Sequence, residues 1–83
     1  MGEKKKIGVV TRYFGKISVA AIMLEDTLKV GDTVSIEGNT TNIQQTIDSM
    51  QVDRKDIQEA GSGQEIAIKV KDRVRDNDKV FLV

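Results

Sequence analysis

The chain has 83 residues, which suits one domain with a thin hydrophobic core, and we expect residues 1–83 to fold as a single unit whose basic start, residues 1–6, is frayed. It carries 13 basic and 13 acidic side chains, so its formal net charge is zero. It has no Cys and no His, which excludes disulfides, thiolate chemistry and the side chain that most often serves as general base or metal ligand.

Residues branched at the β carbon dominate the composition. Val, Ile and Thr together make 25 of the 83 residues, whereas Leu and Ala make only 7. Such side chains suit strands better than helices. The longest apolar run, residues 19–24, is too short to span a bilayer, and the first residues lack the apolar core of a secretory signal. We therefore expect an all-β protein of the cytoplasm without membrane contact.

Alternation of apolar and polar residues between turn residues predicts six strands, in chain order 7–14, 16–24, 33–37, 43–52, 65–71 and 79–83. Apolar residues on both faces of 16–24 indicate either burial on both sides or a sharply curved wall. A parity switch inside 43–52 indicates a β-bulge near residues 48–49. The fold should contain at most one short helical turn, for which residues 56–60 are the candidate. Six short strands predict a small, closed, mostly antiparallel barrel, since closure leaves fewer exposed edges.

The stretch 27–38 organises the chain as a turn followed by a strand. Gly31 lies between Val30 and Asp32, where we expect a backbone conformation that glycine adopts at the lowest cost. Similar chemistry closes the following strand and bends the chain before residue 65. The predicted structural turn residues are Gly31, Asp32, Gly38, Gly61 and Gly63.

Carboxylates offer the only candidate catalytic constellation. Asp53, Asp56 and Glu59 are spaced three apart and could share a helical face for acid–base work, but a solvated polar loop is the favoured alternative. The pair Asp76 and Asp78 supplies too few oxygens for calcium, so a plain turn is favoured there. We predict a protein that is not an enzyme, with no catalytic residues, no metal site and no cofactor.

The charges are unevenly distributed along the chain. Residues 1–16 have a net charge of +4, residues 17–68 one of −6 and residues 69–83 one of +2. Because domain termini are often close in space, the two basic ends are predicted to merge into one surface that neutralises the phosphates of a nucleic acid. This surface would contain Lys4, Lys5, Lys6, Arg12, Lys16, Lys69, Lys71, Arg73 and Arg75. Its last four members share one parity, opposite to Ile66 and Ile68, and would form an outward row if the strand continues. An ordinary solubilising surface remains the alternative.

The order and spacing of four stretches point to a known family. They are Leu28-Lys29-Val30-Gly31-Asp32-x-Val34-x-Ile36-x-Gly38, Ile47-x-Ser49-Met50-Gln51, Ile57-x-Glu59-Ala60-Gly61-x-Gly63-Gln64-x-Ile66-Ala67-Ile68-Lys69-Val70 and Val74-Arg75-x-x-Asp78-x-Val80-Phe81. Together they resemble the second-domain β-barrel of translational GTPases such as elongation factor Tu, over roughly residues 7–83. A comparable small barrel is also found appended to collagenase-like peptidases.

The resemblance implies a stand-alone, elongation-factor-like binding module that acts in translation. The family's phosphate-binding loop is absent from this sequence, so no nucleotide hydrolysis is implied. Its expected partner is RNA or a ribosome-associated protein, while the oligomeric state stays open. The alternative is an accessory protein-interaction barrel like the one appended to collagenase-like peptidases.

Overall fold

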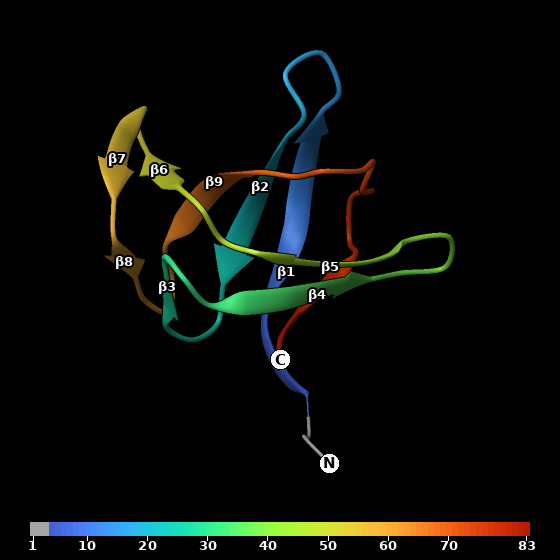
Figure 1. Cartoon of the computed structure of the whole chain (residues 1–83), viewed down its shortest axis with the longest axis horizontal. Coiled ribbons are helices and arrows are strands. Elements are labelled where there is room, and N and C mark those ends of the chain that lie inside the picture. Colours follow the sequence, from blue (N-terminus) through green and yellow to red (C-terminus); the bar gives the residue numbers. More distant parts are fainter. Residues whose placement is uncertain (1–3) are drawn as a thin grey trace.

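The computed structural model describes residues 4–83 as an all-β fold (Figure 1). Within these residues the strands are β1 (Lys5–Phe14), β2 (Val19–Leu24), β3 (Leu28–Lys29), β4 (Thr33–Glu37), β5 (Asn42–Thr46), β6 (Met50–Val52), β7 (Lys55–Ile57), β8 (Glu59–Ala60), β9 (Glu65–Lys69) and β10 (Lys79–Leu82). Eight form one sheet in the order β5-β4-β10-β1-β2-β9-β6-β7, while β3 pairs with β8. All these pairs are antiparallel, so the prediction of a mostly antiparallel all-β fold is confirmed.

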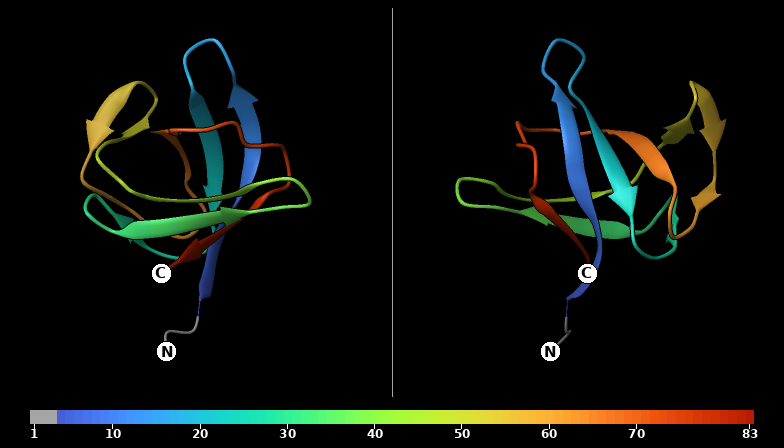
Figure 2. Two further views of the ribbon diagram at one scale, coloured as in Figure 1. Left: turned by 45° about the vertical axis from the view of Figure 1, so that its right-hand side comes forward. Right: turned by 180° about the vertical axis from the view of Figure 1, so that it is seen from behind.

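The predicted closed barrel of six strands is not found. Backbone pairing ends at β5 on one side and at β7 on the other, so the sheet stays open within residues 4–83. The sheet nevertheless curls strongly, as the views from the front and from behind show (Figures 1 and 2). The edge strand β5 approaches the end of β9, where the side chain of Gln45, instead of a backbone ladder, bridges the two segments.

The expected strand 43–52 divides into β5 and β6. Residues 47–49 lie outside both strands, because the backbone of Ile47 bonds to the turn at Gly31 and Asp32 instead. The parity switch therefore marks a break between two strands, and the bulge predicted near residues 48–49 is wrong. The observed register shifts lie in β1, between Lys6 and Gly8 and between Val10 and Arg12.

The candidate segment 56–60 does not form a helical turn. The segment instead contributes to β7, which pairs with β6, and forms β8, which pairs with β3. Such short strands carry almost no periodic signal, and only their distant partners define them. The strand expected at 65–71 ends at Lys69.

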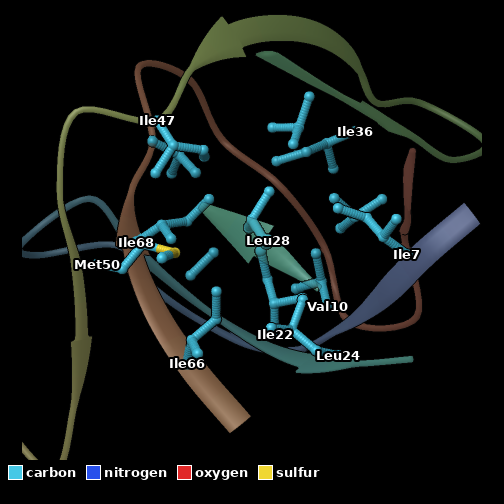
Figure 3. Close-up of a cluster of buried hydrophobic side chains, with 14 of the residues drawn as sticks. Ile7, Val10, Ile22, Leu24, Leu28, Ile36, Ile47, Met50, Ile66 and Ile68 are labelled. Carbon is cyan, nitrogen blue, oxygen red and sulfur yellow. The ribbon is translucent and has the colours of Figure 1, made fainter. Parts of the chain in front are cut away.

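One hydrophobic core fills the inside of the curled sheet. Figure 3 shows the buried side chains converging from β1, β2, β3, β4, β6 and β9; the labelled ones are Ile7, Val10, Ile22, Leu24, Leu28, Ile36, Ile47, Met50, Ile66 and Ile68. In β2 the even-numbered residues Ala20, Ile22 and Leu24 are buried, whereas Met23 is exposed. The strand thus buries one face only, and burial on both sides is wrong for it.

The turn before β4 depends on Gly31. Its φ is +99°, a region that residues with a Cβ rarely adopt. Gly31 donates its N–H to the carbonyl of Ile47 (2.8 Å), and the Asp32 carbonyl accepts the N–H of Ile47 (2.8 Å). The Asp32 carboxylate accepts the N–H of Lys29 at 3.0 Å, which closes the turn.

The other predicted turn glycines have separate roles. Gly63 has a φ of +87°, and Gly61 donates its N–H to the side-chain oxygen of Gln64 at 2.8 Å. Gly38 packs against Asp78 so closely that a Cβ would lie 2.0 Å from a carboxylate oxygen. Gly63 bends the chain before β9, and the missing side chain of Gly38 leaves space for the buried carboxylate of Asp78.

The β1–β2 hairpin runs across the molecule, and its loop projects beyond the other strands (Figures 1 and 2). At its other end, Lys5 and Lys6 of β1 pair with Leu82 and Phe81 of β10. The expected frayed terminus therefore overlaps β1, and its first three residues lie outside the described part. No helix in residues 4–83 is long and apolar enough to cross a membrane.

Candidate functional site

The lysines at the start of β1 are paired with carboxylates. Lys4 contacts Glu37 at 2.5 Å, Lys5 contacts Asp26 at 2.5 Å and Lys6 contacts Glu25 at 3.3 Å. These acidic residues come from the acidic middle of the sequence, which the fold brings beside the basic start. The charge of this segment is therefore largely cancelled where it lies.

Two of these contacts lower the pKa of the carboxyl group that the lysine contacts. The hydrogen bond from Lys4, followed by one from the Ser35 hydroxyl, lowers the pKa of Glu37 below its ordinary value of 4.5. The hydrogen bond from Lys5, together with the N–H of Thr27, lowers the pKa of Asp26 below 3.8. Both carboxylates therefore stay charged to a lower pH than they would without these contacts.

Lys5 and Lys69, two residues of the predicted basic surface, lie far apart. Lys5 lies at the start of β1, whereas Lys69 pairs with Val19, whose own partner is Phe14 at the far end of β1. A strand of ten residues separates these points by about 30 Å along its length. Arg12 lies midway on β1, and Lys16 lies in the hairpin loop. Arg75, by contrast, lines a hollow together with Glu37, the partner of Lys4.

The second basic group borders the open seam between β5 and the segment that follows β9. Lys69 and Lys71 line one hollow of about 480 Å³ with Gln45, and Arg73 and Arg75 line the next, of about 350 Å³. The predicted outward row is not a continuous strand, but its four members line these two hollows, one toward each end of β5. We call the two hollows together, lined by residues 40–43, 45–46, 48–49, 69–73 and 75, the seam groove.

Gln45 makes the contact across the seam groove. Its side-chain nitrogen donates to the Lys69 carbonyl (2.8 Å), and its side-chain oxygen accepts the N–H of Lys71 (3.1 Å). The amide thus replaces two backbone bonds that a closed barrel would make here. The signal in the sequence is that Gln45 is polar yet shares the parity of Ile43 and Ile47.

The outer face of the β1–β2–β9 sheet is apolar. Cross-strand partners lie on the same face, which places Phe14 beside Val19 and Ala21 beside Ala67. These four residues and Ile17 of the hairpin loop line a hollow of about 420 Å³. We call these five residues the outer apolar face. Because alanines occupy its middle, the face is concave.

Two large apolar side chains beside this hollow are exposed, Ile17 at 61% and Phe14 at 41%. Among residues 4–83, Met23 and Val83 are exposed as well, but Met23 pairs with Val9 at the opposite end of the β1–β2 hairpin, and Val83 follows β10. A cluster of this kind marks a contact surface more often than isolated apolar residues do. The sequence analysis assigned Ile17 to a strand and missed this surface; its place just after Gly15 and Lys16 was the available signal.

Polar turn residues border the outer apolar face. Asp53 and Arg54 form the turn between β6 and β7, with φ of 52° and 65°, and Ser18 in the hairpin loop has a φ of 55°. Asp53 and Arg54 also line the hollow. Positive φ at both residues of a two-residue loop is the usual geometry of a tight hairpin, so Asp53 and Arg54 are explained by the β6–β7 turn.

The carboxylates considered for catalysis are not gathered. Asp53 lies in a turn, Asp56 accepts a hydrogen bond from Gln51 (3.0 Å), and Glu59 lies 3.9 Å from Lys29. Since the helical turn is absent, they share no helical face. Asp78 is buried and accepts the N–H of Arg75 at 2.8 Å, as a turn residue does.

Within residues 4–83, no group of three or more carboxylates is placed to hold a metal ion. The predictions of no metal site, no cofactor and no enzymatic activity remain predictions.

Curated relatives match almost the whole chain. An uncharacterized protease of Methanocaldococcus jannaschii is 40% identical over 81 residues, covering 96% of this chain and 20% of that protein. A collagenase of Porphyromonas gingivalis is 33% identical over 81 residues, covering 95% of this chain and 22% of that protein. The chain thus spans about a fifth of the length of the curated relatives it matches. No protein-family model matches it.

A solved structure shows the same fold. The C-terminal domain of a Geobacillus thermoleovorans protein assigned to the U32 peptidases superposes with a TM-score of 0.90, over 95% of this chain and 92% of that one. Its selenomethionine variant gives a TM-score of 0.86. Both are 20% identical to this chain, a level that shows the fold alone.

The resemblance to the second domain of elongation factor Tu is therefore wrong. The sequence matches are a protease and collagenases, and the structural match is a C-terminal domain of a peptidase. The expectations of a role in translation and of RNA binding, which rested on this resemblance, are wrong as well. The quoted stretches largely build turns and strands of a small antiparallel sheet, so they indicate a fold instead of a partner. The comparisons support the alternative of an accessory domain of collagenase-like peptidases.

Proposed function

We propose that this chain is a non-catalytic accessory domain of a collagenase-like peptidase, and that its outer apolar face packs against the rest of that peptidase. The proposal rests mainly on the match to a protease, which is 40% identical over 96% of this chain but only 20% of that protein. In such a relative the matching region shares a polypeptide with a much larger remainder, which is the natural occupant of an apolar face.

Composition supports the non-catalytic part of the proposal. The chain has no Cys and no His, so the usual nucleophile–base pairs of peptidases are unavailable to it. The surface supports the accessory part. The outer apolar face is concave, bordered by charged residues and lined by exposed Phe14 and Ile17, which fits the apolar centre and polar rim of a protein interface.

A domain exchange tests the proposal. In the Porphyromonas gingivalis collagenase, the matching 81 residues are replaced by this chain, and collagen cleavage is compared with that of the same protein lacking the region and with that of this chain alone. We expect no cleavage by the chain alone and more cleavage by the exchanged protein than by the shortened one. Collagen cleavage by the chain alone would contradict the proposal. So would an exchanged protein that folds but cleaves collagen no faster than the shortened protein.

Variants inside the exchanged protein locate the contact. Ile17→Ser on the outer apolar face should reduce collagen cleavage. Val83→Ser is the matched control, since Val83 is also exposed, at 56%, but lies after β10. Equal effects of the two substitutions would remove the outer apolar face from the proposal.

A further inference from the structure

The outward edge of β5 has no strand partner. In an antiparallel pair, alternate residues direct their N–H and C=O groups to the partner strand, and the residues between them direct theirs away. Bonds at both ends of the β4–β5 hairpin fix this alternation: Gly38 donates to Thr41 and Ile47 donates to Asp32, both at 2.8 Å. Ile43 and Gln45 therefore face β4, and the backbone groups of Asn42, Gln44 and Thr46 point away from it. No strand of residues 4–83 pairs with this edge.

The two edges of the sheet differ in how they are protected. Folded proteins commonly guard an edge strand by making it short or charged or by placing proline in it. The edge strand β7 has three residues, two of them charged. The edge strand β5 has five residues, Asn-Ile-Gln-Gln-Thr, with neither charge nor proline. Its backbone thus remains open to pairing with another strand.

The far wall of the seam groove is basic. Lys69, Lys71, Arg73 and Arg75 line it, and within residues 4–83 none of them forms an ion pair. Two acidic residues, Asp48 and Asp72, also line the groove. The Asp72 carboxylate accepts the N–H of Arg73 at 2.7 Å, so it is directed to its own backbone. The groove therefore favours an anionic occupant.

The side chain of Gln45 bridges the two walls of the groove. A side-chain amide, not a backbone ladder, spans the distance from β5 to residues 69–71. A hollow lies toward each end of β5, one lined by Thr46 and one by Asn42. Because the Gln45 bridge is two hydrogen bonds of a single side chain, a strand that enters the groove has little to displace.

We propose that the seam groove binds an extended acidic peptide, which adds to the sheet as a strand along β5. Its backbone pairs with the outward groups of Asn42, Gln44 and Thr46, and the acidic side chains on one of its faces contact Lys69, Lys71, Arg73 and Arg75. Strand addition takes affinity from backbone bonds and specificity from alternate side chains. This site goes beyond the accessory role, and it uses a surface other than the outer apolar face.

The test uses a synthetic peptide of alternating Glu and Thr and the isotopically labelled chain. Amide chemical shifts are recorded by NMR as the peptide is added up to about 1 mM, the weak end of measurable affinity. We expect changes at Asn42, Gln44, Thr46 and residues 69–75, and slower hydrogen exchange at the Gln44 amide. A second peptide of the same sequence is N-methylated at alternate residues, which keeps the charge but removes the donors of one edge; we expect it not to bind.

Two sets of substitutions carry the same charge change. Replacing Lys69, Lys71 and Arg73 by Gln should weaken binding by about tenfold, as expected for three exposed ion pairs. Replacing Lys29, Arg54 and Lys55 by Gln, away from the groove, should change the affinity less than about twofold. Gln44→Pro removes the outward N–H and should abolish binding, whereas Gln44→Ala should preserve it.

Three results would overturn the proposal. The first is the absence of shifts up to the highest peptide concentration. The second is equal binding of the N-methylated peptide, which would reduce the interaction to charge. The third is an oligonucleotide of equal charge that produces the same shifts, which would make the groove a general surface for polyanions.

Discussion

The two faces of β2 are both apolar in sequence and have different roles in the structure. Ala20, Ile22 and Leu24 on the inner face are fully buried in the core. Val19 and Ala21 on the outer face stay partly accessible and floor a hollow. The difference teaches that an apolar residue on a strand can serve folding or contact, and that only the curl of the sheet decides which. Substitutions on the inner face should lower the stability of the fold. Substitutions on the outer face should weaken its association with the rest of the peptidase.

The largest expected effect lies on the inner face. Ile22 has no exposed surface and pairs with Val10 and Ile66 in the centre of the sheet. Ile22→Ala should lower the free energy of unfolding by about 2–5 kcal/mol, because it leaves a cavity in a tightly packed core. Chemical denaturation measures the change. A loss under about 1 kcal/mol, the size of a conservative core change, would mean that the inner face is not the core of the fold.

A smaller loss of stability is expected at Gly31, where the backbone conformation and not burial makes a substitution unfavourable. Gly31→Ala should lower the free energy of unfolding by about 1 kcal/mol or more, since its φ of +99° is strained for any residue with a Cβ. A Cβ there would meet no atom within 4 Å, so crowding adds nothing. Gly15→Ala is the control, because Gly15 lacks a positive φ in this range and a Cβ there meets only Tyr13, at 3.5 Å. Equal denaturation midpoints for the two variants would refute this account of the turn.

Substitutions on the outer face should hardly change the free energy of unfolding. Ile17→Ser and Met23→Ser should each change the free energy of unfolding by less than about 0.5 kcal/mol, because both side chains are exposed. The same denaturation experiment measures both. Losses comparable to that of Ile22→Ala would show that the outer face belongs to the core, and its assignment as a contact surface would then be wrong.

The smallest effect concerns the paired lysines at the start of β1. Lys4 lowers the pKa of Glu37 below 4.5, so this pair stabilises the fold above that pH and loses its contribution as the pH falls through the lowered pKa. In Lys4→Gln the pKa of Glu37 should rise, and stability should depend less on pH in this acidic range. An NMR titration of Glu37 measures the shift. An unchanged pKa would show that the pair is not formed in solution.

Local signals made part of the fold predictable. The β-branched composition indicated an all-β chain, and strict alternation placed Ile66 and Ile68 in the core. Gly31 next to Asp32 indicated the turn, because few other residues tolerate its backbone. These features depend on neighbours within a few residues, which a sequence displays directly.

The features that were missed depend on distant partners. The open seam rests on the contact of Gln45 with Lys69 and Lys71, more than 20 residues later. The pairing of Lys4 with Glu37 spans 33 residues and cancels a charge that looked free in the sequence. The alternation of the predicted strand 16–24 showed which residues share a face, but gave no sign of which face the sheet would curl around.

The central claim is that the outer apolar face is covered by the rest of a collagenase-like peptidase. Amide hydrogen exchange of residues 14–23 measures this most directly, compared between this chain alone and the exchanged collagenase that contains it. We expect slower exchange in the hairpin loop, including the amide of Ile17, whose bond to the Phe14 carbonyl is long at 3.3 Å, when the remainder of the peptidase is present. Equal exchange of residues 14–23 in the two proteins, or slowing confined to strands away from the hairpin, would contradict the claim.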